Sequence, residues 1–111
     1  MNFSPSEENY IKHIYHLQLE DGTVSASQLA SSLETTAASV TEMLKKLNTK
    51  KILHYQPYKN FSLTDKGNKV ALEIVRKHRL WEFFLVAKLG FTWDEVHDVA
   101  EQLEHIQSIK L

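Results

Sequence analysis

Two short amphipathic segments separated by only three residues constrain the fold of this chain more than any other feature. Residues 26–33 predict a short helix, since Leu29 and Leu33 lie about one helical turn apart. Residues 37–50 predict a second helix, whose apolar side chains recur at helical spacing as Val40, Met43, Leu44 and Leu47. The linking residues 34–36 predict a tight turn, and this turn contains no glycine.

The segments on either side complete a characteristic order of elements. Residues 4–7 provide a capping serine, a proline at the first helical position and an acidic first turn, which predicts a helix that runs to about Leu19. Residues 52–56 and 60–64 have the pattern of two short strands, and residues 57–59 between them favour a β-hairpin. Helix, short helix, turn, helix and hairpin is the order of a winged helix-turn-helix.

Two further helices are predicted after the hairpin. Thr64 can cap a long helix over residues 66–89, which Gly90 ends, and Thr92 can cap a fifth helix. The long helix has more apolar surface than one thin helical layer can cover, so we expect part of it to meet a partner subunit. The expected fold class is mainly α with a small β-hairpin, with a winged helix-turn-helix DNA-binding domain in residues 1–66 and metal-binding and dimerisation helices in residues 67–111.

Charge is unevenly distributed along the chain, although the net charge is only −1. Between Glu42 and Lys66 there are six lysines and two acids, a local balance of +4, which favours contact with nucleic acid. Ala38 and Ser39 are small enough to allow close approach to DNA at the start of their helix. The residues that we expect to read bases or bind phosphates are Thr41, Glu42, Lys45, Lys46, Lys50 and, in the hairpin, Lys59. The alternative is that these lysines form an ordinary solvated surface.

Residues 93–105 hold five carboxylates and two histidines, with no lysine or arginine. On a helix, one face would carry His97, Glu101, Glu104 and His105. A divalent cation would relieve the repulsion among the carboxylates, and imidazole with carboxylate suits first-row transition metals. A solvated acidic helix face is the alternative, and this stretch alone favours neither interpretation. The chain has no cysteine, which excludes a thiolate zinc site and a disulfide framework.

Five groups of residues, spread over nearly the whole chain, follow the pattern of one family. They are Glu8 to Tyr15, Ala38 to Met43, Leu63 to Gly67, Arg76 to Leu80, and Val96-His97-Asp98 followed by Glu101, Glu104 and His105. In these groups the chain resembles the metal-dependent repressors typified by the diphtheria toxin repressor and the manganese transport regulator.

The resemblance implies a mechanism in which Mn(II) or Fe(II) binds between the first, fourth and fifth helices and sets the spacing of two DNA-binding domains in a homodimer. The expected outcome is repression of metal-uptake genes at a palindromic double-stranded DNA operator. By position, the family's metal sites fall on Glu101, Glu104 and His105 and, in a neighbouring site, on His78, Glu82 and His97. Its DNA-contacting positions fall on Thr36, Ala38, Ser39 and Glu42.

Some residues depart from the ligand pattern of the family. Asn9 stands where the family has Met or Asp, although an amide oxygen can still coordinate a metal, and the adjacent Glu8 is a candidate substitute. Lys12 stands where manganese-type members have a ligating Glu, which a protonated lysine cannot replace. Glu101 stands where iron-type members have Cys, and a carboxylate favours Mn(II) or Fe(II) over thiol-preferring ions.

Other functions fit the sequence less well. The main alternative is a winged-helix regulator that is not gated by metal, and a protein-binding winged helix would leave the lysine face unused. No HExxH or similar motif and no glycine-rich loop is present, so we expect neither enzymatic activity nor a small-molecule substrate. The sequence has no signal peptide and no long apolar run, and we expect a cytoplasmic protein without membrane contact. The family continues with a further helix, so we expect the chain to be incomplete after Leu111.

Overall fold

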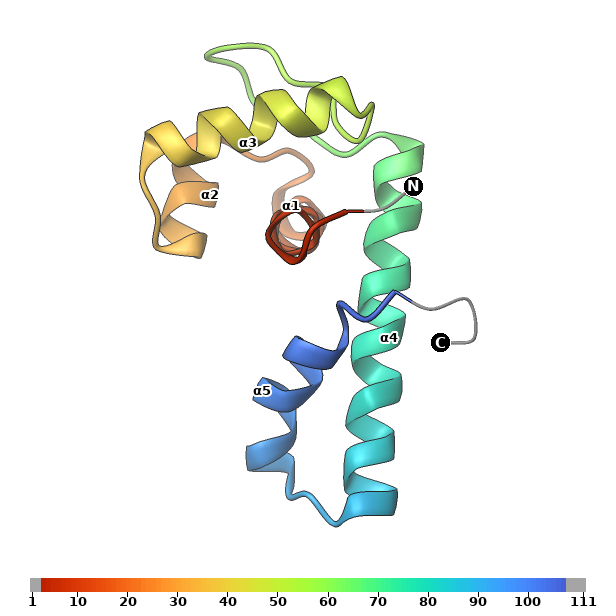
Figure 1. Cartoon of the computed structure of the whole chain (residues 1–111). Coiled ribbons are helices and arrows are strands. Elements are labelled where there is room, and N and C mark those ends of the chain that lie inside the picture. The colour runs from red at the N-terminus through yellow and green to blue at the C-terminus, as the bar shows by residue number, and fades with distance from the viewer. Residues whose placement is uncertain (1–2, 108–111) are drawn as a thin grey trace.

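The computed structural model describes residues 3–107, and this part of the chain forms five helices (Figure 1). The helices are α1 (Pro5–Asp21), α2 (Ala26–Leu33), α3 (Ala37–Thr49), α4 (Asp65–Leu89) and α5 (Trp93–Leu103). Each helix lies where the sequence predicts it, with ends that differ by no more than about two residues, as is usual for helix ends. The predicted mainly helical fold class is confirmed.

Local hydrogen bonds explain why the helices begin where they do. The Glu7 backbone N–H donates to Ser4 Oγ at 3.1 Å, and the Ser4 backbone N–H donates to Glu7 Oε1 at 2.9 Å, a reciprocal capping box. Ser25 and Gln28 make the same exchange at the start of α2. At the C-terminal end of α4, Gly90 adopts φ 73°. Glycine takes this conformation without steric cost, and the helix ends there.

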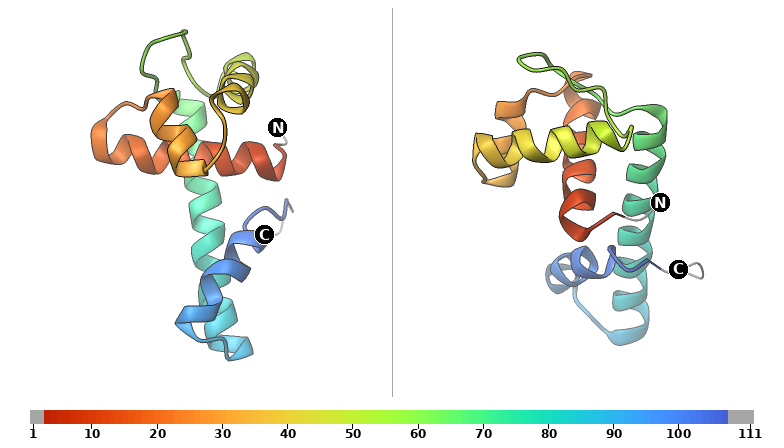
Figure 2. Two further views of the ribbon diagram at one scale, coloured as in Figure 1. Left: turned by 90° about the vertical axis from the view of Figure 1, so that its left-hand side faces the viewer. Right: turned by 45° about the horizontal axis from the view of Figure 1, so that its top comes forward.

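Helices α1, α2 and α3 pack together and form the helix-turn-helix, as two further views show (Figure 2). Its centre is apolar and fully buried, with Ile11, Ile14, Leu29, Val40, Leu44 and Leu47 among its members. The predicted turn between α2 and α3 is present, and Glu34 provides it by adopting φ 53° and ψ 46°. This left-handed conformation is unfavourable for a residue with a Cβ atom.

The predicted β-hairpin between α3 and α4 is not confirmed. In residues 3–107 the backbone forms isolated antiparallel bridges and no regular strand, the bridges being Val24 with Phe61 and Leu53 with Leu63. Phe61 pairs its backbone N–H and carbonyl with Val24, at 2.8 Å each, so these groups are bonded to the segment before α2 and not across a hairpin. The segment projects beside α3 as a loop, which is anchored by buried Leu53 and Phe61 (Figure 1). We call residues 52–63 the wing loop.

Helix α4 connects the two ends of the molecule. Its first half packs against α1, and its second half packs against α5 (Figure 1). A small second core, separate from that of the helix-turn-helix, forms around Leu85, Val96 and Ala100. Several large apolar side chains of this region are nevertheless exposed, namely Leu72, Leu80, Phe83, Phe84, Leu89 and Trp93. None of the helices in the described part of the chain is long and apolar enough to cross a membrane.

Candidate metal centre and DNA-facing surface

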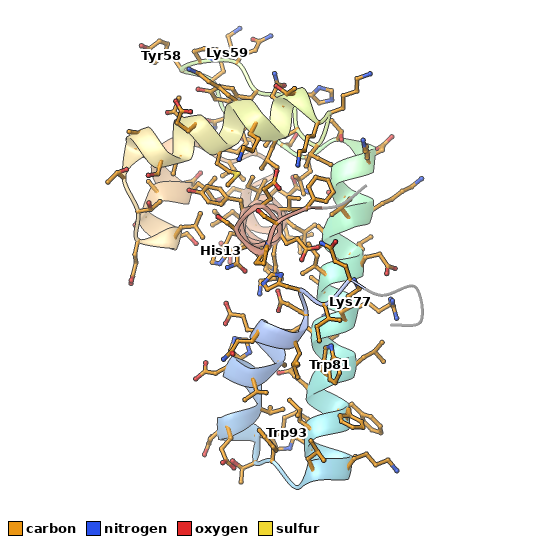
Figure 3. All side chains as sticks on the ribbon, viewed as in Figure 1. His13, Tyr58, Lys59, Lys77, Trp81 and Trp93 are labelled. Carbon is orange, nitrogen blue, oxygen red and sulfur yellow. The ribbon has the colours of Figure 1, made fainter. Side chains whose placement is uncertain are left out.

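A cavity of about 440 Å³ lies where α1, α4 and α5 come together. Its lining is rich in ionisable groups from all three helices, namely Lys12, His13 and His16, then His78, Arg79 and Glu82, then His97 and Glu101. Figure 3 shows His13 on the side of α1 that faces α5. The cavity therefore places imidazoles and carboxylates next to the first helix of the helix-turn-helix.

Three side chains in this cavity converge on one point. Each of His78, Glu82 and His97 offers a possible ligand atom, and these atoms all lie within 4.8 Å of one another. His78 Nε2 is 3.4 Å from Glu82 Oε2, and His97 Nδ1 is 3.8 Å from the same oxygen. The side chain of His97 is 63% exposed, so an ion could reach the group from solvent.

The sequence explains this convergence in two steps. His78 and Glu82 are four residues apart on α4 and therefore point the same way. The short link at Gly90 turns the chain so that α5 packs back along α4, which brings His97 to the pair. Glu101, one turn after His97, lies beside this group, with its Oε2 3.8 Å from His97 Nε2, whereas His97 Nδ1 is the nitrogen that faces Glu82. Two imidazoles with carboxylates fit a divalent first-row ion.

A second group of ionisable residues surrounds the fully buried carboxylate of Glu104. The Lys12 ammonium donates to both of its oxygens, at 3.0 Å to Oε1 and 2.8 Å to Oε2. His78 Nδ1 lies 2.6 Å from Oε1 of the same carboxylate. An ionised carboxylate can only accept hydrogen bonds, so His78 donates from Nδ1 and keeps its Nε2 lone pair for the three-residue group.

The remaining predicted ligands lie beside this ion pair. His105 Nδ1 is 2.8 Å from Glu8 Oε1, and both side chains are about nine-tenths buried. Gln107 Nε2 donates to the Phe3 carbonyl at 2.6 Å. Asn9 Oδ1 is buried and has no hydrogen-bond partner among residues 3–107. These residues join the start of α1 to the segment that follows α5.

The eight predicted ligands thus form two groups that differ in their fit to a metal ion. The possible ligand atoms of His78, Glu82 and His97 lie close together, and the ion pairs recorded for Glu82 and for the neighbouring Glu101 are with histidines. Around Glu104, the Lys12 ammonium already binds both carboxylate oxygens. The first group fits a divalent ion, whereas the second, as it stands, does not.

The pKa of His13, a histidine that was not predicted as a ligand, is shifted in this cavity. Partial burial, followed by the nearby charge of Lys12, lowers the pKa of the His13 imidazole from its usual 6.5. His13 Nδ1 also lies 2.9 Å from Ser32 Oγ, which links α1 to α2. His13 is therefore held mostly neutral at neutral pH between the cavity and the helix-turn-helix.

The predicted DNA-reading residues lie largely on one exposed face of α3 and its N-terminus. Ala38, Ser39, Glu42, Lys45 and Lys46 are exposed, while Thr41 is half-buried. Thr36 caps the helix, since its Oγ1 accepts from the Ser39 backbone N–H at 3.1 Å. Lys59 lies with Tyr58 at the exposed tip of the wing loop (Figure 3).

Lys50 is placed differently from the other predicted DNA contacts. Its ammonium is 2.7 Å from Glu7 Oε2 and lies 5.0 Å from the centre of the Phe3 ring. Burial raises the pKa of the Glu7 carboxyl, but the hydrogen bonds from Lys50 and Ser4 outweigh that effect and lower it overall. Lys50 therefore fastens the end of α3 to the start of α1.

Several residues that line the cavity were not expected in the metal site. They are His13, His16 and Arg79. Lys12 was recognised only as a departure from a ligand pattern, and its buried contact with Glu104 was not expected. The position of Lys12 one turn after Glu8 on α1 was the one available signal that it faces the same site.

The fold and these two surfaces define a helix-turn-helix DNA-binding protein with a metal-binding module. Residues 2–61 match the family model of the N-terminal DNA binding domain of iron dependent repressors, and residues 64–111 match that of their metal binding and dimerisation domain. The chain belongs to the iron dependent repressor family.

Similar proteins include regulators named for manganese and for iron. The HTH-type transcriptional regulator MntR of Oceanobacillus iheyensis is 37% identical over 102 residues, which cover 92% of this chain and 69% of that protein. The iron-dependent repressor IdeR of Mycobacterium leprae is 34% identical over 101 residues, which cover 91% of this chain and 44% of that protein.

Solved structures agree with this placement. A manganese-dependent transcriptional repressor in complex with manganese has a TM-score of 0.81 and 39% identity, with 94% of this chain and 48% of that chain covered. The manganese regulator SloR has a TM-score of 0.77 and 39% identity, with 96% and 50% covered. The chain spans about half the length of these two structures.

Proposed function

We propose that this chain is a metal-responsive transcriptional repressor that binds DNA and takes Mn(II) or Fe(II) as its signal. The observation that carries this proposal is the convergence of His78, Glu82 and His97 beside α1 of the helix-turn-helix. Family membership and the manganese- and iron-dependent regulators among its relatives support it. We assign DNA binding to residues 1–66 and metal binding with dimerisation to residues 67–111.

On the DNA side, α3 enters the major groove with its exposed face. Ala38 and Ser39 allow close approach, and Glu42 can accept from a cytosine amino group. Lys45, Lys46 and, from the wing loop, Lys59 bind phosphates, which makes affinity fall with salt. Thr36 and Thr41 flank these groups. Lys50 is the weakest of the predicted contacts, because its ammonium would have to leave Glu7.

On the metal side, the residues that hold the ion are His78, Glu82 and His97, with Glu101 as a fourth candidate. A bound divalent ion supplies positive charge that offsets the carboxylates and links α4 to α5. The chain itself carries the link onward. Glu104 fixes His78 on α4 and binds Lys12 on α1, and α1 packs against α2 and α3.

A homodimer on a palindromic operator completes the proposal. The exposed apolar side chains of α4 and α5 form more apolar surface than an isolated subunit of this size would leave in water. Lys77, Leu80, Trp81 and Phe84 line a largely apolar hollow on this side of α4, and Figure 3 shows Trp81 in this part of the helix. Pairing of two copies there would place two α3 helices on a symmetric site.

The proposal is tested by selecting bound sequences from a pool of random DNA duplexes with and without Mn²⁺. Enrichment of a palindromic sequence only with Mn²⁺ is expected for the unaltered chain. Glu82→Gln should abolish this enrichment, while Glu73→Gln, an exposed acid on the same helix, should leave it intact. Equal enrichment without metal would instead favour a winged-helix regulator that is not gated by metal.

A further inference from the structure

The contact between Lys12 and Glu104 joins two charged groups that are both withdrawn from water. The side chain of Lys12 is 11% exposed and that of Glu104 is fully buried. The two residues are 92 positions apart in sequence, so the pair exists only in the folded chain. Burial of such charges is costly unless each has a partner, and here each is the partner of the other.

The neighbouring groups leave little room for another cation. Glu8 is paired with His105, and Glu104 is shared between Lys12 and His78. A metal ion that took Glu104 as a ligand would have to displace the Lys12 ammonium. Displacement would leave a buried lysine without its carboxylate, next to a second positive charge.

We propose that the Lys12 ammonium takes the place of a second metal ion, so that each chain binds a single divalent ion. That ion is held by His78, Glu82 and His97. Glu104 is then a positioning residue for His78 and not a ligand. This inference rests on the proposed metal site, but it concerns the number of ions and the role of Glu104.

The contacts of Glu104 show how it would position His78. It accepts from His78 Nδ1 at 2.6 Å, which orients the ring and leaves Nε2 free toward Glu82. A carboxylate behind a ligating histidine commonly does this in metal sites. Lys12 holds the carboxylate in place, so α1 and the segment after α5 are joined before any metal binds.

The first experiment counts ions. The full chain is dialysed to equilibrium against excess Mn²⁺, and bound metal is measured by mass spectrometry. One ion per chain is expected for the unaltered protein, and none for His97→Ala. Glu104→Gln should still bind one ion, with affinity reduced by about 10- to 100-fold, because the amide oxygen can accept from His78 but carries no charge. Two ions in the unaltered chain, or none in Glu104→Gln, would overturn the proposal.

The second experiment replaces Lys12, whose ammonium binds Glu104. Lys12→Glu adds a carboxylate to Glu8, Glu104 and His105 and should raise the count from one ion to two. Lys12→Arg keeps the charge and should stay at one, as should Lys69→Glu, which reverses an exposed charge on α4. A folded Lys12→Glu protein, verified by circular dichroism, that still binds one ion would contradict the proposal. If that variant does not fold, the counts for the unaltered chain and Glu104→Gln decide.

These outcomes separate the inference from the proposed function. If the chain binds one Mn²⁺ but its DNA affinity does not change with the metal, the repressor mechanism is overturned and the single-ion inference stands. If the chain binds two ions and its DNA affinity changes with the metal, the single-ion inference is overturned and the repressor mechanism stands.

Discussion

Glu34 pays a conformational cost for the tight turn between α2 and α3, since it has φ 53° and a Cβ atom. Glycine adopts this conformation freely and is the residue most often found there at helix ends. Glu34→Gly should therefore raise the free energy of unfolding by about 0.5–1 kcal/mol, which urea denaturation would measure.

A matched control for this change lies within a helix. Glu73 is exposed in the middle of α4, where glycine is unfavourable. Glu73→Gly should lower the free energy of unfolding by about 1 kcal/mol. Equal destabilisation by both substitutions would contradict the strain assigned to Glu34.

At the scale of single residues, neighbours on one helix were easier to predict from the sequence than contacts between helices. His78 and Glu82 could be paired in advance because their spacing on one helix fixes their direction. The contact of Lys12 with Glu104 could not, since it depends on how α1 and the end of α5 meet through α4. Lys50 was expected to contact DNA because the sequence shows its spacing from the other lysines near α3. The sequence does not show its contact with Glu7 on α1, which depends on how the helices pack.

At the scale of elements, the junction between the wing loop and α4 depends on Gly67. A Cβ atom at this position would clash with the Ile52 carbonyl oxygen, which also accepts from the Thr64 backbone N–H at 2.9 Å. Gly67→Ala should therefore displace the wing loop and lower the free energy of unfolding by about 1–3 kcal/mol.

Thermal and urea denaturation would check this prediction against Lys69→Ala, two residues further along α4 and exposed. The control should change stability by no more than about 0.5 kcal/mol. A Gly67→Ala protein as stable as the control would show that the wing loop can move aside without cost.

Helices were predictable as elements because their signals are local. Ser4, Ser25 and Thr64 each cap a helix within three residues of themselves, and the apolar spacing sets each buried face. Pairing in the wing loop is not local in this sense. Phe61 bridges to Val24, which precedes α2, so this pairing depends on how the whole helix-turn-helix packs.

At the scale of the whole molecule, stability should depend on pH through His13. Burial, with the charge of Lys12, lowers the pKa of this imidazole in the folded state below 6.5. As pH falls below 6.5, His13 is protonated more readily in the unfolded chain than in the folded chain. The stability that His13 contributes above that pH is therefore lost on acidification.

Urea denaturation in the presence of a chelator at pH 7.5 and pH 5.5 would measure this loss. His13→Asn removes the titrating group and should show a smaller loss of stability between the two pH values. An equal loss in both proteins would mean that His13 contributes nothing to the pH dependence.

The arrangement of the whole molecule suggests how the two ends communicate. Helix α4 packs against α1 at one end and α5 at the other. Glu8 and Lys12 of α1 are also joined to His105 and Glu104 in the segment that follows α5. An ion can change DNA affinity only to the extent that it binds one arrangement of these elements better than another. Couplings of this kind are typically about 5- to 150-fold.

The most direct test of the proposed repressor is therefore the ratio of DNA affinities with and without Mn²⁺, measured by fluorescence anisotropy at fixed salt on a selected duplex. We expect at least about a 5-fold gain in affinity with Mn²⁺ for the unaltered chain and for Glu73→Gln, and no gain for Glu82→Gln. A ratio of one for the unaltered chain, with metal shown to be bound, would contradict the proposed repressor mechanism.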